Sequence, residues 1–127
     1  MDSKIKSLFQ KAKEASYLAY SPYSNFKVGA AILTKNERVI TGCNVENASY
    51  GATICAERVA ICKALSEGEI DFIALTVFVQ SETVFPPCGI CRQFMAEFSD
   101  DMIVVYGNDD IIHETNIKSL LPETFRL

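Results

Sequence analysis

The segment from Phe72 to Val79 is a nearly continuous run of apolar residues, and it constrains the fold more than any other part of the sequence. A strand with one face in water alternates apolar and polar residues, whereas a strand covered on both faces is apolar along its length. The run is also far shorter than the roughly 20 residues of a membrane-spanning helix. The sequence therefore predicts a central strand with other elements packed on both of its faces.

Other segments around this run show strand and helix patterns. Strands are expected at 26–34, 39–45, 72–79, 102–106 and 111–114, with a hairpin between the first two. Helices are expected within residues 1–20, where the pattern is amphipathic, at 55–67 and 88–99, and as a last turn that Asn116 caps. This order predicts an α/β fold of three layers, with one mixed central sheet of about five strands and helices on both faces. The 127 residues fit one domain, 1–127.

The charge of the chain argues against a polymeric partner. Its net charge is −4, and lysines and arginines form no cluster in the sequence. A protein that binds nucleic acid needs a basic surface to replace the counterions of the phosphates. We therefore expect neither a nucleic-acid partner nor a membrane, but a small neutral ligand.

The cysteines indicate metal binding or catalysis. The first residues are charged where a signal peptide would be apolar, so we expect the protein in the cytoplasm. Disulfides are rare in that compartment, and the five cysteines are an odd number. We assign Cys43 and Cys62 to packing and look for chemistry in the other three.

Those three cysteines lie in two segments, Cys55-Ala56-Glu57-Arg58 and Pro87-Cys88-Gly89-Ile90-Cys91-Arg92, and each segment begins an expected helix. Residues three apart share a helical face, so Cys88 and Cys91 can hold one ion together. Cys55 and Glu57 are about 200° apart around a helix, so the ion must lie beyond the helix start. Two helix N-termini would stabilise the thiolates, and Arg58 and Arg92 can add hydrogen bonds to sulfur and tune the charge.

Three protein ligands leave the fourth position of a tetrahedral zinc ion open to water, which is typical of a catalytic site. Glu57 is close enough to move protons without being a ligand. Two other interpretations remain. The cysteines could be inert core residues, or the zinc could be structural, with Cys43, Cys62 or His113 as a fourth ligand.

Five ordered motifs between about residue 20 and the end of the chain resemble the small, homotetrameric, zinc-dependent cytidine deaminases. They are Ser21-Pro22-Tyr23-Ser24-Asn25-Phe26, the segment from Gly42 to Tyr50, Cys55-Ala56-Glu57-Arg58, the segment from Pro87 to Gln93, and Leu121-Pro122-Glu123-Thr124-Phe125. A three-cysteine zinc site with a separate glutamate as general acid and base is known in zinc deaminases. The resemblance implies a cytidine-deaminase-like fold and one zinc ion per chain.

The resemblance also implies roles for residues outside the metal site. Asn44 and Glu46 would bind the ribose 3′-hydroxyl, and Tyr50 would lie near the 5′-hydroxyl across a subunit boundary. The backbone of Ala56 would bind the base carbonyl, and that of Cys88 the amino group. Phe26 would flank the pyrimidine ring, and Phe125 would reach the base from a neighbouring subunit.

The implied reaction is the hydrolysis of cytidine or deoxycytidine to uridine or deoxyuridine and ammonia, as in pyrimidine salvage. Glu57 would deprotonate water, protonate N3 and then the leaving amino group. The alternatives are a deaminase for another cytosine-containing small molecule, such as a blasticidin-type antibiotic, and a non-enzymatic protein with structural zinc. The partners would be a nucleoside and other copies of the chain in a homotetramer that shares its active sites.

Overall fold

Five strands form one mixed sheet in the computed structural model of the chain, which describes residues 1–127. They are β1 (Val28–Thr34), β2 (Val39–Cys43), β3 (Phe72–Val79), β4 (Ile103–Gly107) and β5 (Ile112–Asn116). Their order across the sheet is β2-β1-β3-β4-β5, and only the β3–β4 pair is parallel. The apolar run is thus the central strand, as predicted, and Ile73 is its only exposed residue.

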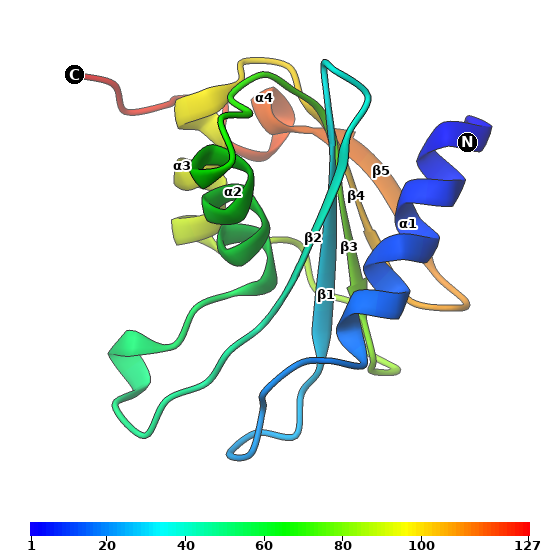
Figure 1. The fold of residues 1–127 in the computed structure, drawn as a ribbon, viewed down its shortest axis with the longest axis vertical. Helices are drawn as coiled ribbons and strands as arrows, with labels where there is room; N and C mark the ends of the chain where they lie inside the picture. Colours follow the sequence, from blue (N-terminus) through cyan, green and yellow to red (C-terminus); the bar gives the residue numbers. More distant parts are fainter.

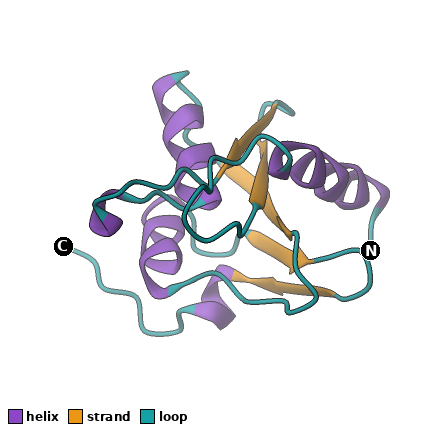
Figure 2. Cartoon of the chain, turned by 90° about the horizontal axis from the view of Figure 1, so that it is seen from below, coloured by secondary structure: helices purple, strands orange, loops and turns teal.

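Helices cover both faces of this sheet. They are α1 (Ser3–Ser16), α2 (Ala56–Ser66), α3 (Gly89–Phe98) and the short α4 (Ile117–Leu120). Figure 1 shows α1 on one face and the pair α2 and α3 on the other, and Figure 2 shows the same layers from below. The three-layer α/β fold is therefore confirmed. None of the helices has the length and apolar character needed to cross a membrane.

Each face of the sheet has its own hydrophobic core. Under α1, Leu8 and Phe9 pack against Phe78 of β3, and the rings of Phe9 and Phe78 are 5.5 Å apart. Under α2 and α3, Ile61 and Met95 pack against Leu75 of the same strand. Burial of these side chains is the main force that holds the layers together, since each contributes roughly 1.5–3 kcal/mol.

Gly42 in β2 allows α2 to lie unusually close to the sheet. A methyl group added at Gly42 would be 2.5 Å from the backbone nitrogen of Ala60 and 2.9 Å from the carbonyl oxygen of Ala56. Ala56 and Ala60 are fully buried at this contact. The small residues on both sides therefore fix the position of α2, and with it the start of the helix at Ala56.

Several boundaries differ from the predicted ones. β1 begins at Val28, because Asn25 has a φ of 58° and the polar backbone atoms of Phe26 bond to side chains instead of to a strand. β2 ends at Cys43, and Val45 forms isolated bridges to Tyr20 and Ile54. The cap of the last helical turn is as predicted, since the Asn116 side chain accepts a hydrogen bond from the Ser119 N–H at 2.8 Å.

Candidate metal centre

Three cysteines meet where α2 and α3 begin. Cys55 is the N-cap of α2, Cys88 is the N-cap of α3, and Cys91 lies in the first turn of α3. Their sulfur atoms all lie within 4.8 Å of one another. Cys91 is buried, Cys55 is half-buried and Cys88 is exposed. The cluster thus lies beyond the two helix starts, and one side of it is open.

The donor set fits a zinc ion. Sulfur ligands at about 2.3 Å from a tetrahedral zinc are about 3.8 Å apart, so small side-chain rotations would bring these three into range. Thiolate sulfur is also the soft donor that zinc prefers over magnesium or calcium.

No fourth histidine, cysteine or carboxylate joins the cluster. Cys62 is exposed on α2, so its assignment to packing is wrong, and it does not face the cluster. His113 lies in β5, where its ring stacks on that of Tyr106 at 4.9 Å. Cys43 is half-buried in β2. A closed site with four protein ligands is therefore not formed, and one coordination position remains for a small molecule.

The groups around the sulfur atoms favour the thiolate form of Cys55. The thiol of Cys91 and the guanidinium of Arg58 donate hydrogen bonds to Cys55, and they lower the pKa of Cys55 to about 5 against the opposing effect of burial. Donating its proton to Cys55 raises the pKa of Cys91. Several thiolates at this spacing repel one another, so a cation between them would release the remaining protons.

Arg58 is the charged residue that faces the cluster. Its Nη2 lies 3.5 Å from the sulfur of Cys55 and 3.5 Å from the carbonyl oxygen of Thr53. Its Nε is buried without a partner in the protein. The positive charge of Arg58 reduces the excess negative charge that three thiolates would give to a zinc site.

Glu57 provides a carboxyl group next to the cluster without belonging to it. It lies in the first turn of α2 and is 5% exposed. Burial, reinforced by the negative charge of Cys55, raises the pKa of Glu57 to about 7. A group with a pKa near neutrality can both accept and donate a proton at physiological pH.

A cavity of about 180 Å³ opens onto these groups. Its lining includes two of the three cysteines and several other residues predicted from the sequence: Phe26, Asn44, Cys55, Ala56, Glu57 and Cys88. Phe85 also lines it and was missed by the sequence analysis. Its ring meets that of Phe26 edge to face at 5.5 Å. Its position directly before Pro86-Pro87-Cys88 could have identified it, because the two prolines restrict the backbone that leads to the metal ligand Cys88.

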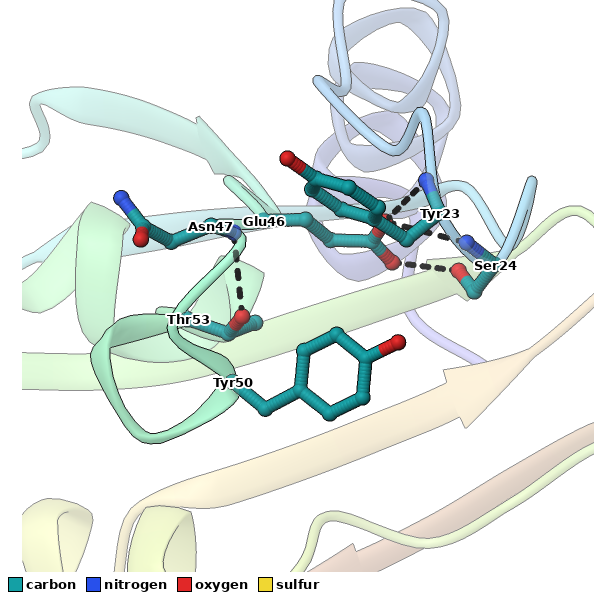
Figure 3. A pocket seen from close by; sticks show the side chains of 6 residues that line it. All are labelled: Tyr23, Ser24, Glu46, Asn47, Tyr50 and Thr53. Atoms are coloured by element: carbon teal, nitrogen blue, oxygen red, sulfur yellow. Dashed lines mark hydrogen bonds between the residues drawn. The ribbon is translucent and has the colours of Figure 1, made fainter.

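A second cavity, of about 360 Å³, adjoins the first at Thr53, which lines both. Figure 3 shows its lining of Tyr23, Ser24, Glu46, Asn47, Tyr50 and Thr53. Tyr50 is 76% exposed, and the rings of Tyr23 and Tyr50 are 6.2 Å apart. Glu46 and Tyr50 are thus near the first cavity but do not line it.

Asn44 and Glu46 are tied to the segment that carries Phe26. The Asn44 Oδ1 accepts a hydrogen bond from the Val28 N–H at 2.9 Å, and its Nδ2 donates to the Phe26 carbonyl at 2.7 Å. The Glu46 Oε1 accepts from the backbone N–H groups of Tyr23 and Ser24 at 3.0 and 3.1 Å, and its Oε2 accepts from the Ser24 hydroxyl. These bonds lower the pKa of Glu46, the Ser24 hydroxyl most of all.

Arg92 and Phe125 line neither of these two cavities. The Arg92 guanidinium donates to the carbonyl oxygens of Pro87 at 2.7 Å and Leu120 at 2.9 Å. The expected bond from Arg92 to a sulfur is not formed, because the side chain turns toward the C-terminal segment. Phe125 is 66% exposed, lines neither cavity, and its carbonyl accepts a bond from Gln93.

Residues 2–107 match the family model described as the cytidine and deoxycytidylate deaminase zinc-binding region. A cytidine deaminase of Halalkalibacterium halodurans is 49% identical over 120 residues, which cover 93% of this chain and 91% of the relative. A blasticidin-S deaminase of Bacillus cereus is 32% identical over 103 residues, which cover 75% of this chain and 74% of that protein. The crystal structure of cytidine deaminase from Burkholderia pseudomallei superposes with a TM-score of 0.91 at 43% identity, and covers 98% of this chain and all of the other.

Proposed function

Because the chain belongs to the family of zinc-binding cytidine and deoxycytidylate deaminases, we propose that it is a hydrolase that converts cytidine and deoxycytidine to the corresponding uridines and ammonia. The reaction replaces the 4-amino group of the pyrimidine by oxygen from water. It serves pyrimidine salvage in the cytoplasm, where free cysteines persist.

One observation carries this proposal: Glu57 lines the same small cavity as Cys55 and Cys88, two of the three cysteines of the cluster. Cys55, Cys88 and Cys91 hold zinc, and Arg58 limits the negative charge of the set. Zinc at such a site acts as a Lewis acid that acidifies water to a pKa near 7. The rings of Phe26 and Phe85 form an apolar wall of the cavity.

Glu57 moves the protons. With a pKa of about 7, its carboxylate takes a proton from the attacking water and gives it to N3 of the base, which makes C4 more electrophilic. It then takes the second proton of the attacking oxygen and delivers it to the amino group, which leaves as ammonia. The backbone N–H of Ala56 donates to the base carbonyl, and the carbonyl of Cys88 accepts from the amino group.

The sugar is held through its 3′-hydroxyl. A carboxylate accepts about four hydrogen bonds, and Glu46 uses three, so one acceptor position remains on Oε2. An amide NH₂ donates two, and Asn44 uses one. The pair thus offers one donor and one acceptor, which matches a hydroxyl group. Binding at the 3′ position explains how both ribose and deoxyribose are accepted.

The working form is a homotetramer with shared active sites. Ile90, with 64% of its surface exposed, Phe94 and Phe98 line an open groove on α3 that a second copy would cover. Phe125 and Tyr50 are highly exposed aromatic residues that lie outside the cavity of Glu57 in their own chain. In the assembly, Phe125 covers the base in a neighbouring subunit, and Tyr50 contributes near the 5′-hydroxyl across a boundary.

The experiment is ammonia release from cytidine, deoxycytidine, CMP and blasticidin S by the purified protein, with zinc measured per chain. We expect activity on both nucleosides and one zinc per chain. Activity on blasticidin S alone would instead assign the chain to the blasticidin-S deaminases. Tightly bound zinc without any deamination would favour a structural site.

A further inference from the structure

Ser24 joins the two halves of the substrate site through a single hydroxyl group. The Ser24 Oγ donates to Glu46 Oε2 and accepts from the backbone N–H of Phe26 at 2.9 Å. Figure 3 shows the carboxylate of Glu46 reaching the backbone and hydroxyl of Ser24. A continuous chain of hydrogen bonds thus runs from Phe26, on the wall of the base cavity, to the carboxylate of Glu46.

The hydroxyl of Ser24 also determines which acceptor of Glu46 is free. Both N–H groups of the turn point at Oε1, whose two lone pairs are therefore in use. Ser24 occupies one lone pair of Oε2 and leaves the other. Without the Ser24 hydroxyl, the carboxylate would keep its attachment to both backbone N–H groups through Oε1, but Oε2 would no longer be held in one orientation.

We propose that Ser24 is a positioning residue for recognition of the 3′-hydroxyl, because it orients the one free acceptor of Glu46 and ties it to the wall residue Phe26. This inference rests on the proposed function and adds to it a residue that determines specificity. A hydroxyl that both accepts from Phe26 and donates to Glu46 is polarised by each bond, which strengthens the chain as a whole.

The test compares cytidine with 3′-deoxycytidine in Ser24→Ala, Ser24→Thr and the parent protein. For Ser24→Ala, kcat/KM for cytidine should fall about three- to tenfold, mostly through KM, since the lost bond to a charged group is partly exposed. The change for 3′-deoxycytidine should stay below about twofold, because that substrate has no group for Oε2. Ser24→Thr keeps the hydroxyl and should retain discrimination. Ser7→Ala, on the exposed surface of α1, is the control.

Failure of the proposed function and failure of the proposed role of Ser24 would give different results. Absence of cytidine deamination in the parent protein would refute the proposed function itself. The proposed role is wrong if the parent has the same kcat/KM for both substrates, or if Ser24→Ala lowers kcat/KM for both to the same extent. Ser24 would then support only the backbone of Phe26. If Ser24→Ala does not fold, a loss of discrimination in the folded Ser24→Thr protein would equally overturn the proposal.

Discussion

Glu57 is an ionisable residue whose surroundings oppose its ionisation. It is buried beside a thiolate, and the backbone N–H at the start of α2, the thiol of Cys91 and the charge of Arg58 compensate only in part. These surroundings are unfavourable for stability but suit proton transfer near pH 7. The contrast with Glu46 is informative, because three hydrogen bonds hold that carboxylate in its charged form.

Replacing Glu57 by glutamine should remove catalysis and leave the metal in place. The amide keeps the shape of the side chain but cannot shuttle a proton, so we expect kcat to fall by roughly 10²–10⁴ or more. The measurements are cytidine turnover and zinc per chain. Glu14→Gln, on the exposed side of α1, is the control. A Glu57→Gln protein that turns over at the parent rate would contradict the assignment.

Glu46 should make the stability of the protein depend on pH. Its folded pKa is lower than its ordinary value of 4.5, mainly because of the Ser24 hydroxyl, so its contribution is present above pH 4.5 and is lost as the pH falls through the folded pKa. Glu46→Gln should thus be less stable than the parent at pH 6, and the two should converge at lower pH. Urea denaturation across pH 3–6 tests this. If the difference in unfolding free energy between the parent and Glu46→Gln grew as the pH fell, the assigned direction of the Glu46 pKa shift would be wrong.

At the level of elements, the strongest sequence patterns corresponded to the most buried segments. The apolar run of β3 and the cysteines at the two helix starts were sufficient to predict the central strand and the metal cluster. The weaker predictions depended on where single side chains turn in space. Sequence spacing cannot show that Arg92 bonds to carbonyls rather than sulfur, that Cys62 faces outward, or that Phe85 meets Phe26.

Substitution of Gly42 by alanine should displace α2 and with it the metal cluster. The new methyl group would meet the backbone of Ala56 and Ala60, which cannot rotate away, so we expect a destabilisation of about 1–3 kcal/mol or more. Gly51→Ala is the matched control, because its methyl group would meet no atom within 4 Å. The free energy of unfolding, measured by chemical denaturation, and the zinc content should both be lower in Gly42→Ala and unchanged in Gly51→Ala. Equal stability of the two variants would show that α2 is not held by this contact.

At the level of the whole molecule, exposed aromatic side chains are the features that the proposed homotetramer would use. Tyr50 and Phe125 are among the most exposed, and each belongs to a segment that projects from the layered body in Figure 1. The proposed homotetramer would give both segments a role in the active site of a neighbouring subunit.

Phe125→Ala should raise KM for cytidine without affecting zinc binding. The lost aromatic contact is worth about 0.5–1.5 kcal/mol, or about two- to thirteenfold in KM. Leu127→Ala, on the same exposed tail, is the control. When the parent protein is diluted, its sedimentation coefficient and its specific activity should fall in parallel as the subunits separate. A fully active monomer, or an unchanged kcat/KM in Phe125→Ala, would rule out the shared site.

The meeting of two helix starts has a consequence for how the chain unfolds. Cys55 and Cys88 are 33 positions apart and enclose the whole of β3, so a zinc ion between them acts as a cross-link that closes a loop around the central strand. The three sulfur atoms come together only in the folded chain, so zinc binds the folded state in preference to the unfolded one, and the stabilisation follows the concentration of free metal. Each tenfold rise in free zinc above the dissociation constant should add about 1.4 kcal/mol to the free energy of unfolding, and thermal unfolding in zinc buffers would show it as a steady rise in Tm. A Tm that does not change with the concentration of free zinc would mean that the ion does not bridge the two helices.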